Sequence, residues 1–233
     1  IGVGLLYQAT GTLNIADLAV RVSELSDSRS VRAAFGFMTV GIGIKLALFP
    51  LHVWLPNAYA YAPSVSSAFL AATATKVSIY VLIRVFYTIF GPAFSFETLP
   101  LDWVLLPLAI IAMFAGSVIA IFEVDVKRML AYSSVAQIGY IILGISLASV
   151  LGLTGGLLHL FNHALMKGAL FLAMGCVFYQ LGSVALSDLD GVGRRMPWTM
   201  AAFVIGGLSL IGIPLTAGFV SKLYLLWEIG RAH

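Results

Sequence analysis

The chain has 233 residues, of which 61% are hydrophobic and 10% charged, with a formal net charge of +3 and a mean hydropathy of +1.02. A typical soluble domain is about 25% charged, so this composition excludes an ordinary soluble protein. The basic residues form no tract suited to nucleic acid, and we expect no nucleic-acid partner. The composition predicts an all-α, multi-pass membrane protein whose first partner is the lipid bilayer.

Residues 1–32 are predicted to hold the end of a preceding span followed by a helix on the membrane surface. The opening IGVGLL lacks the basic and cleavage regions of a signal peptide. Further along, Ile15, Leu18, Val22 and Leu25 recur at helical spacing, and Asn14 is placed to act as the N-cap. An amphipathic pattern of this kind, between two apolar runs, is typical of a helix lying on a bilayer.

Residues 33–233 are predicted to form one transmembrane bundle of about six full spans and one incomplete span. A bilayer core about 30 Å thick requires roughly 20 apolar residues per span. Short connections favour a single helical bundle. The expected spans are 33–55, 63–90, 103–122, 129–149, 153–181, 198–213 and the run from 216 onward. The last run stops short of a full crossing, and we therefore expect an internal fragment of a larger subunit.

Two of these spans are predicted to be discontinuous helices. The breaking residues are Pro50 and Pro56 in the first span and Gly212, Pro214 and Gly218 in the last run. Proline removes an amide donor and leaves a carbonyl of the preceding turn without its partner. Lys45 lies in the first broken segment and Lys222 in the last. Discontinuous helices in membrane transporters mark the ion site.

A polar stripe crosses the long apolar run from 153 to 181. His159, His163 and Lys167 lie at positions i, i+4 and i+8, which places them on one helical face over roughly 12 Å. A charged side chain at mid-membrane costs about 2.5 to 3.5 kcal/mol on insertion scales, and such groups normally face the bundle interior. Lys45 and Lys76 lie at a similar depth in their own spans, roughly 18 Å from the span start. A line of ionisable groups in the membrane plane suits proton relay, with candidate members Lys45, Lys76, His159, His163, Lys167 and Lys222.

Other interpretations of these residues stay open. The buried lysines could be structural, and the two histidines could be packing residues or a metal or haem pair at i and i+4. No third ligand accompanies the histidines, so we predict no metal and no cofactor. His52, beside Pro50 and Trp54, could transfer protons or could lie at the interface and satisfy backbone groups. Three further polar residues, Ser133, Gln137 and Tyr140, could line water or could only bond neighbouring helices.

Four charged residues, Glu123, Asp125, Lys127 and Arg128, lie between two apolar runs. We expect them to form a tight loop that anchors the chain at the membrane interface. The single cysteine, Cys176, lies within an apolar run, so no disulfide framework is available and the residue is expected to be a small buried filler.

Four strings in the chain resemble a known family, the antiporter-like proton-translocating subunits. This family is shared by respiratory complex I, membrane-bound hydrogenases and Mrp-type multisubunit cation/proton antiporters. The strings occur in the family's order and cover nearly the whole chain: KLALFPLHVWLPNAYAYAP, VDVKRMLAYSSVAQIGY, HLFNHALMKGALFL and GIPLTAGFVSKLYLL.

The resemblance assigns roles to individual residues. Lys45 matches the lysine of the family's broken seventh helix, Lys76 the relay lysine of the eighth, and Lys222 the ionisable residue of the broken twelfth. His159, His163 and Lys167 match the central stripe that joins two half-channels. The complete subunit would have about fourteen helices, and the family's glutamate partner of the seventh-helix lysine would lie before this fragment.

Within the family, TGTLNIADLA and LPNAYAYAP look most like the D-type subunits of Mrp antiporters. The resemblance therefore implies a proton-conducting subunit of a monovalent cation (Na⁺)/proton antiporter in the cell inner membrane. Its partners would be other hydrophobic subunits, protons and sodium ions. One alternative is a proton-pumping subunit of complex I or of a membrane-bound hydrogenase, which would make the chain part of an enzyme. Another is a scaffold that does not conduct.

Overall fold

The computed structural model describes residues 1–231, in which the chain is built from helices, connecting loops and one isolated bridge between Asp125 and Ala185. The helices in chain order are α1 (Gly2–Thr10), α2 (Ile15–Glu24), α3 (Arg29–Leu46), α4 (Trp54–Tyr61), α5 (Ser64–Arg84), η1 (Val85–Ile89), η2 (Ala93–Thr98), α6 (Asp102–Ile121), α7 (Val126–Ser146), α8 (Val150–Leu181), η3 (Leu186–Asp188), α9 (Val192–Arg195), α10 (Pro197–Ile211) and α11 (Ala217–Arg231). The predicted all-α fold class is confirmed.

The predicted amphipathic helix near the N-terminus is α2. The side chain of Asn14 caps it by accepting a hydrogen bond from the backbone N–H of Ala16 at 3.0 Å, which satisfies one of the unpaired donors of the first turn. Leu18 and Val22 face inward and are buried. The helix and its cap are thus as predicted, and its position on a membrane surface stays a prediction.

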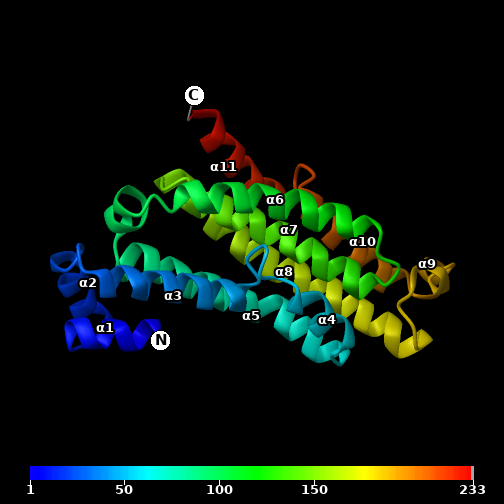
Figure 1. Cartoon of the computed structure of the whole chain (residues 1–233). Coiled ribbons are helices and arrows are strands. Elements are labelled where there is room, and N and C mark those ends of the chain that lie inside the picture. Colours follow the sequence, from blue (N-terminus) through cyan, green and yellow to red (C-terminus); the bar gives the residue numbers. More distant parts are fainter. Residues whose placement is uncertain (232–233) are drawn as a thin grey trace.

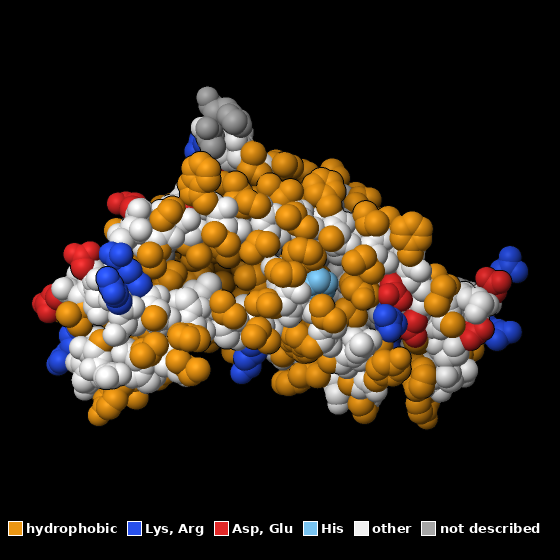
Figure 2. All heavy atoms as spheres, viewed as in Figure 1, with side chains coloured by type: hydrophobic (Ala, Val, Ile, Leu, Met, Phe, Trp, Pro, Cys, Tyr) orange, Lys and Arg blue, Asp and Glu red, His pale blue; other side chains and the backbone are white. Residues whose placement is uncertain are grey.

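Four helical segments are long and apolar enough to cross a membrane, namely Ser64–Ile89, Asp102–Ile121, Val126–Ser146 and Val150–Leu181. They coincide with predicted spans to within a few residues. The spans expected at 33–55 and 198–213 correspond to shorter helices, α3 with 18 residues and α10 with 15. Figure 2 shows hydrophobic side chains over the middle of one face, with charged side chains gathered toward its two ends. This distribution fits a bundle whose long axes cross a bilayer.

Helix α8 is the centre of the bundle. It packs against α5, α7, α10 and α11, so residues on several of its faces meet other helices rather than lipid (Figure 1). Glycine permits one of these close approaches, because a Cβ on Gly144 of α7 would lie 2.6 Å from the carbonyl oxygen of Gly152 on α8. Small residues bring helices together in membranes in this way. Polar side chains of α7 can therefore reach the stripe on α8.

The first predicted helix break lies between α3 and α4. Helix α3 ends at Leu46, and Ala47 adopts a left-handed conformation with φ 62°. The carbonyl of Ile44, near the end of α3, accepts a hydrogen bond from Nε1 of Trp54 at 2.8 Å. This carbonyl also accepts from the backbone N–H of Ala47 at 3.1 Å, so a side chain of the next helix adds a second hydrogen bond at the break.

The second predicted break separates α10 from α11. Helix α10 ends at Ile211, where Gly212 takes a φ of 91°, a conformation that favours glycine. On the other side of the break, a Cβ on Gly218 would lie 1.8 Å from the carbonyl oxygen of Ser209. Only glycine fits this approach of α11 to α10. Both discontinuous helices are therefore present.

Candidate functional site

The polar stripe of α8 faces the interior of the bundle. His159, His163 and Lys167 have no exposed surface. The two imidazole rings stack with centroids 6.2 Å apart and planes inclined by 7°. The predicted inward orientation of the stripe is confirmed, whereas its role in proton transfer stays a prediction.

His159 is held by partners on two neighbouring helices. Its Nε2 lies 2.8 Å from Oε1 of Gln137 on α7, and its Nδ1 lies 2.9 Å from Oγ of Ser221 on α11. The Ser221 hydroxyl can donate to the carbonyl of Gly218, 3.1 Å away, and accept from a protonated Nδ1. Alternatively, it can turn and donate to a bare Nδ1. These partners therefore accommodate a ring that carries either one proton or two.

His163 differs from His159 because neither of its ring nitrogens has a hydrogen-bond partner among the described residues. Buried polar atoms of this kind usually bind ordered water in proteins. Charges on Lys76, Lys167 and Lys222 are close enough to act on His163 electrostatically. The ring therefore lies at the point where the lysines from three helices converge.

Lys167 reaches from α8 to the backbone of α7. Its Nζ donates to the carbonyl oxygen of Leu130 at 2.6 Å and to the hydroxyl of Ser133. No ion pair within residues 1–231 includes Lys167. Because its partners are neutral oxygens, the amine can lose or gain a proton without separating an ion pair.

Lys76 lies on α5 and is 5% exposed. Its amine donates to the carbonyl of Ala71 on its own helix. The charge of Lys76 also acts on Lys167 and on both histidines of the stripe. Lys76 thus extends the buried polar line from α8 to α5.

Lys222 ends the line on the α11 side and is half-buried. Its Nζ donates to the carbonyls of Leu210 at 2.9 Å and Ile211 at 3.1 Å, which are among the unpaired carbonyls at the C-terminal end of α10. A helix C-terminus carries partial negative charge and favours a cation. The amine also lies 4.6 Å from the centroid of the Tyr140 ring, and this ring is 5.7 Å from that of His159. Tyr140 therefore contacts both Lys222 and His159.

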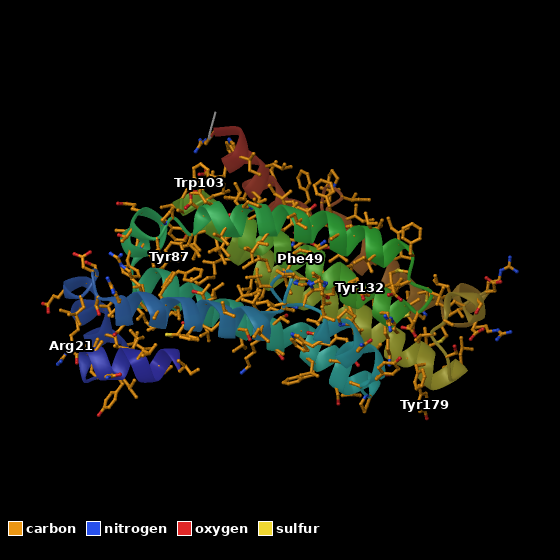
Figure 3. All side chains as sticks on the ribbon, in the orientation of Figure 1. Arg21, Phe49, Tyr87, Trp103, Tyr132 and Tyr179 are labelled. Atoms are coloured by element: carbon orange, nitrogen blue, oxygen red, sulfur yellow. The ribbon has the colours of Figure 1, made fainter. Side chains whose placement is uncertain are left out.

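Lys45 and His52 lie apart from this line, near the first helix break. Lys45 is exposed in the last turn of α3, and no side-chain hydrogen bond in the described part of the chain involves it. His52 is buried and stacks on Phe49 with ring centroids 5.1 Å apart, and Figure 3 labels Phe49 in the segment between α3 and α4. The structure therefore places five of the six predicted relay residues on the mutually packed helices α5, α8 and α11 and leaves Lys45 separate.

The prediction that Lys127 lies in a charged loop is wrong. Asp125 caps α7 by accepting from the backbone N–H of Arg128 at 2.9 Å, so the helix begins at Val126 and Lys127 lies in its first turn. Lys127 is only 4% exposed. Lys127 is buried because helices distant in the sequence pack around it. The local charge pattern does not reveal this packing.

Cys176, expected to be buried, is exposed on α8. The sequence interpretation also missed Ser221, which is fully buried and bonds His159. Its position directly before Lys222 in a broken helix was the signal that could have identified it. The partner of Lys167 is the backbone carbonyl of Leu130, and the type of side chain does not identify such an acceptor.

Acidic side chains take no part in the buried line within residues 1–231. The three ion pairs of this region are Arg21–Asp17, Arg32–Asp27 and Arg128–Glu123. In the same region, no three His, Cys, Asp or Glu side chains gather closely enough to hold a metal ion. The arrangement is a row of amines, imidazoles and hydroxyls, each of which can bind and release a proton.

Comparison with known proteins relates this arrangement to large membrane complexes. The chain is 50% identical over 229 residues to NADH-quinone oxidoreductase subunit N from Desulforudis audaxviator, covering 97% of this chain and 45% of the relative. It is 36% identical over 228 residues to the D subunit of a Na⁺/H⁺ antiporter from Alkalihalophilus pseudofirmus, covering 97% of this chain and 45% of that protein. The chain thus spans slightly less than half the length of these relatives.

Solved structures of an Mrp complex and of complex I contain chains with the same fold. A chain of the Mrp complex from Dietzia sp. DQ12-45-1b superposes with a TM-score of 0.90 at 35% identity, covering 99% of this chain and 42% of that chain. A chain of respiratory complex I from Thermus thermophilus superposes with a TM-score of 0.76 at 28% identity, covering 99% of this chain and 48% of that chain. The family profile described as NADH:quinone oxidoreductase/Mrp antiporter, transmembrane, matches residues 1–233. The chain therefore belongs to the antiporter-like membrane subunits shared by Mrp complexes and complex I.

Proposed function

We propose that this chain conducts protons within the membrane, through a buried line that runs from Lys76 on α5 across the stripe of α8 to Lys222 on α11. The observation that carries the proposal is the row of buried ionisable side chains contributed by three packed helices, supported by polar groups from a fourth, α7. Ionisable groups inside a membrane are rare and mark ion or proton pathways.

The proposed transfer uses each residue according to its contacts. A proton on Lys76 passes to Lys167, whose amine is held by neutral oxygens. From Lys167 it reaches His163, whose unpaired nitrogens exchange protons through water. His159 then takes up and releases the proton at Nδ1, because the Ser221 hydroxyl accommodates this nitrogen with or without a proton while Nε2–H stays bonded to Oε1 of Gln137. Lys222 is the exit on the α11 side.

Lys45 is proposed to act at the entrance rather than within the line. It lies in the last turn of a broken helix, immediately before Leu46 and Ala47, and its side chain is exposed on this chain. An exposed lysine at membrane depth requires a partner in the assembled complex, because a charged side chain facing lipid is costly. We propose that a carboxylate elsewhere in the complex pairs with Lys45 and sets when it takes up a proton.

The assembly that we propose first is an Mrp-type antiporter, in which proton flux is exchanged for sodium ions. The TM-score of 0.90 against a chain of an Mrp complex supports this assignment. The 50% identity to a NADH-quinone oxidoreductase subunit N supports a second candidate, a redox-driven proton pump. Purification of the native complex separates the two. Flavin and iron–sulfur absorbance would support the pump, and a colourless complex of hydrophobic subunits would support the antiporter.

Conduction itself is tested with the purified complex in proteoliposomes that contain a pH-sensitive dye. We expect Lys76→Met to reduce proton flux by about a hundredfold, the effect of losing a positioned proton-transfer group. Arg84→Met is the matched control, because Arg84 is a basic residue at the end of the same helix. Equal flux in the Lys76 variant and the control, at equal assembly, would contradict the proposal.

A further inference from the structure

Three membrane-spanning segments end at the same level of the bundle, around Lys127. Ser64 is the first residue of one span and Lys127 the second residue of another, while Phe178 lies close to the end of a third. Lys127 contacts both of the others, since its Nζ donates to the Ser64 hydroxyl at 3.1 Å and lies 4.9 Å from the centroid of the Phe178 ring. Ends of spans lie at the depth of the lipid headgroups.

Lys127 is a buried cation whose charge is not balanced by an ion pair. It is 4% exposed, and none of the ion pairs within residues 1–231 includes it. An ammonium group has three N–H donors, of which Ser64 accepts one. The residue also lies in the first turn of α7, where the helix dipole is positive and favours anions. Lys127 therefore has N–H donors left for a further acceptor, and an anion suits this position.

Lys127 lines a cavity of about 560 Å³ between the end of α8 and the start of α7. Two other charged side chains line it, and both are engaged. Asp125 accepts from the backbone N–H of Arg128, and the Arg128 guanidinium pairs with Glu123 at 3.1 Å. Asp125 keeps its negative charge while it caps the helix, and this charge acts on Lys127 without forming an ion pair with it. Lys127 therefore still has N–H donors open to a further acceptor in this cavity.

A second cavity of about 830 Å³ adjoins the first, because Pro63, Ser64 and Phe178 line both. It follows one face of α8, lined by Leu172, Gly175, Cys176 and Tyr179 at helical spacing, with Met196 and Thr199 among its other lining residues. Figure 3 labels Tyr179 near the end of α8. Leu172 lies nine residues before Leu181, the last residue of that span, so this apolar groove extends about 13 Å into it.

We propose that these two cavities together bind one anionic phospholipid. The phosphate accepts hydrogen bonds from Nζ of Lys127, and an acyl chain lies in the apolar groove along α8. Arg195 lines a smaller cavity that shares Met196 with the groove, and it adds positive charge at the same end of the bundle.

A phospholipid accounts for both the cavity at Lys127 and the apolar groove along α8. A free phosphate would leave the apolar groove unoccupied, and an apolar helix would leave the Lys127 ammonium without an anion. A phospholipid supplies the anion at headgroup depth and the hydrocarbon below it. The site is distinct from the proposed proton line and does not depend on proton conduction.

The test uses the whole purified complex in nanodiscs that contain a trace of phosphatidylglycerol or phosphatidylcholine with a photoreactive acyl chain. After irradiation, mass spectrometry of the peptide containing Leu172–Tyr179 measures crosslinking. We expect phosphatidylglycerol to crosslink several-fold more than phosphatidylcholine. Lys127→Gln should reduce the phosphatidylglycerol signal by about fivefold, whereas Lys127→Arg should retain it. Arg29→Gln, which changes a basic residue at the start of α3, is the control that should not alter it.

A second variant keeps the test informative if Lys127→Gln fails to assemble. Cys176→Trp fills the groove while leaving Lys127 in place, and it should also lower crosslinking. Inorganic phosphate at millimolar concentration should not compete, because the acyl chain contributes to binding. Equal crosslinking of the two lipids, no effect of either variant, or competition by free phosphate would overturn the proposal.

Discussion

His159 and His163 stack one helical turn apart with nearly parallel rings, yet only His159 is hydrogen-bonded within the described part of the chain. Only one of the two histidines therefore links helices by hydrogen bonds. His159 holds α7 and α11 to α8, whereas His163 makes no contribution to hydrogen bonding between helices. If both conduct protons, both are needed for flux but only one is needed for stability.

This asymmetry gives the first prediction, which compares His159→Leu with His163→Leu. The first variant leaves Gln137 without its buried partner, at a cost of about 1 to 3 kcal/mol for the unsatisfied group, while Ser221 keeps only its bond to the carbonyl of Gly218. It should lower the apparent melting midpoint of the purified complex, whereas the second should leave it nearly unchanged. Both should abolish proton flux in proteoliposomes. A His163→Leu complex that transports at the normal rate would show that His163 only fills space.

The second prediction concerns the break before α11. Gly218→Ala places a Cβ 1.8 Å from the carbonyl oxygen of Ser209, so α11 has to move away from α10. Overpacking of this kind costs about 1 to 3 kcal/mol or more, and the shift displaces Ser221 and Lys222 from their partners. We expect proton flux to fall at least tenfold, as about 1.4 kcal/mol would produce.

The matched control is Gly207→Ala on α10, because a Cβ there meets no atom within 4 Å. It should retain normal flux and assembly. If Gly218→Ala matched this control, the close approach of the two helix ends would have no bearing on conduction.

A third prediction separates capping from proton transfer at Lys222. Lys222→Gln keeps an N–H donor for the carbonyls of Leu210 and Ile211 but cannot release a proton at neutral pH. The complex should assemble and lose no more than about 1 kcal/mol of stability, while proton flux falls about a hundredfold. Lys222→Arg keeps the charge and the donors but cannot release a proton, so it should lose flux as the Gln variant does. Normal flux through the Gln variant would mean that Lys222 only caps α10.

The fourth prediction is that Lys45→Ala removes transport without weakening the fold. Lys45 is exposed and makes no side-chain hydrogen bond or ion pair within residues 1–231, so its loss breaks no such bond there. Flux and the amount of assembled complex are measured in the same vesicle preparation. Retention of full flux in assembled complex would exclude Lys45 from proton uptake.

The helices could be predicted from the sequence because each depends on a local pattern. Apolar runs located the four long spans to within a few residues, and Asn14 marked the start of α2. The spacing of His159, His163 and Lys167 predicted a buried stripe, because helical periodicity fixes which residues share a face. Pro50, Gly212 and Pro214 located both helix breaks, whereas Pro56 and Gly218 lie inside α4 and α11.

Contacts between distant segments could not be predicted in this way. The burial of Lys127 depends on Ser64 and Phe178, which belong to other helices. The partner of Lys167 is a backbone carbonyl, and every residue carries one. The exposure of Lys45 depends on what surrounds α3 rather than on the sequence of α3. These contacts and exposures depend on how the helices pack against one another. A single sequence does not specify that packing.

The most direct test of the central claim is proton flux through the reconstituted complex that carries Lys167→Met, compared with Arg194→Met. Lys167 has no exposed surface and lies in the middle of the line, whereas Arg194 is exposed in α9. Methionine replaces lysine at similar length without a titratable group. We predict that Lys167→Met reduces flux about a hundredfold at normal assembly and that Arg194→Met leaves it unchanged. Normal flux through assembled Lys167→Met would contradict conduction along this line.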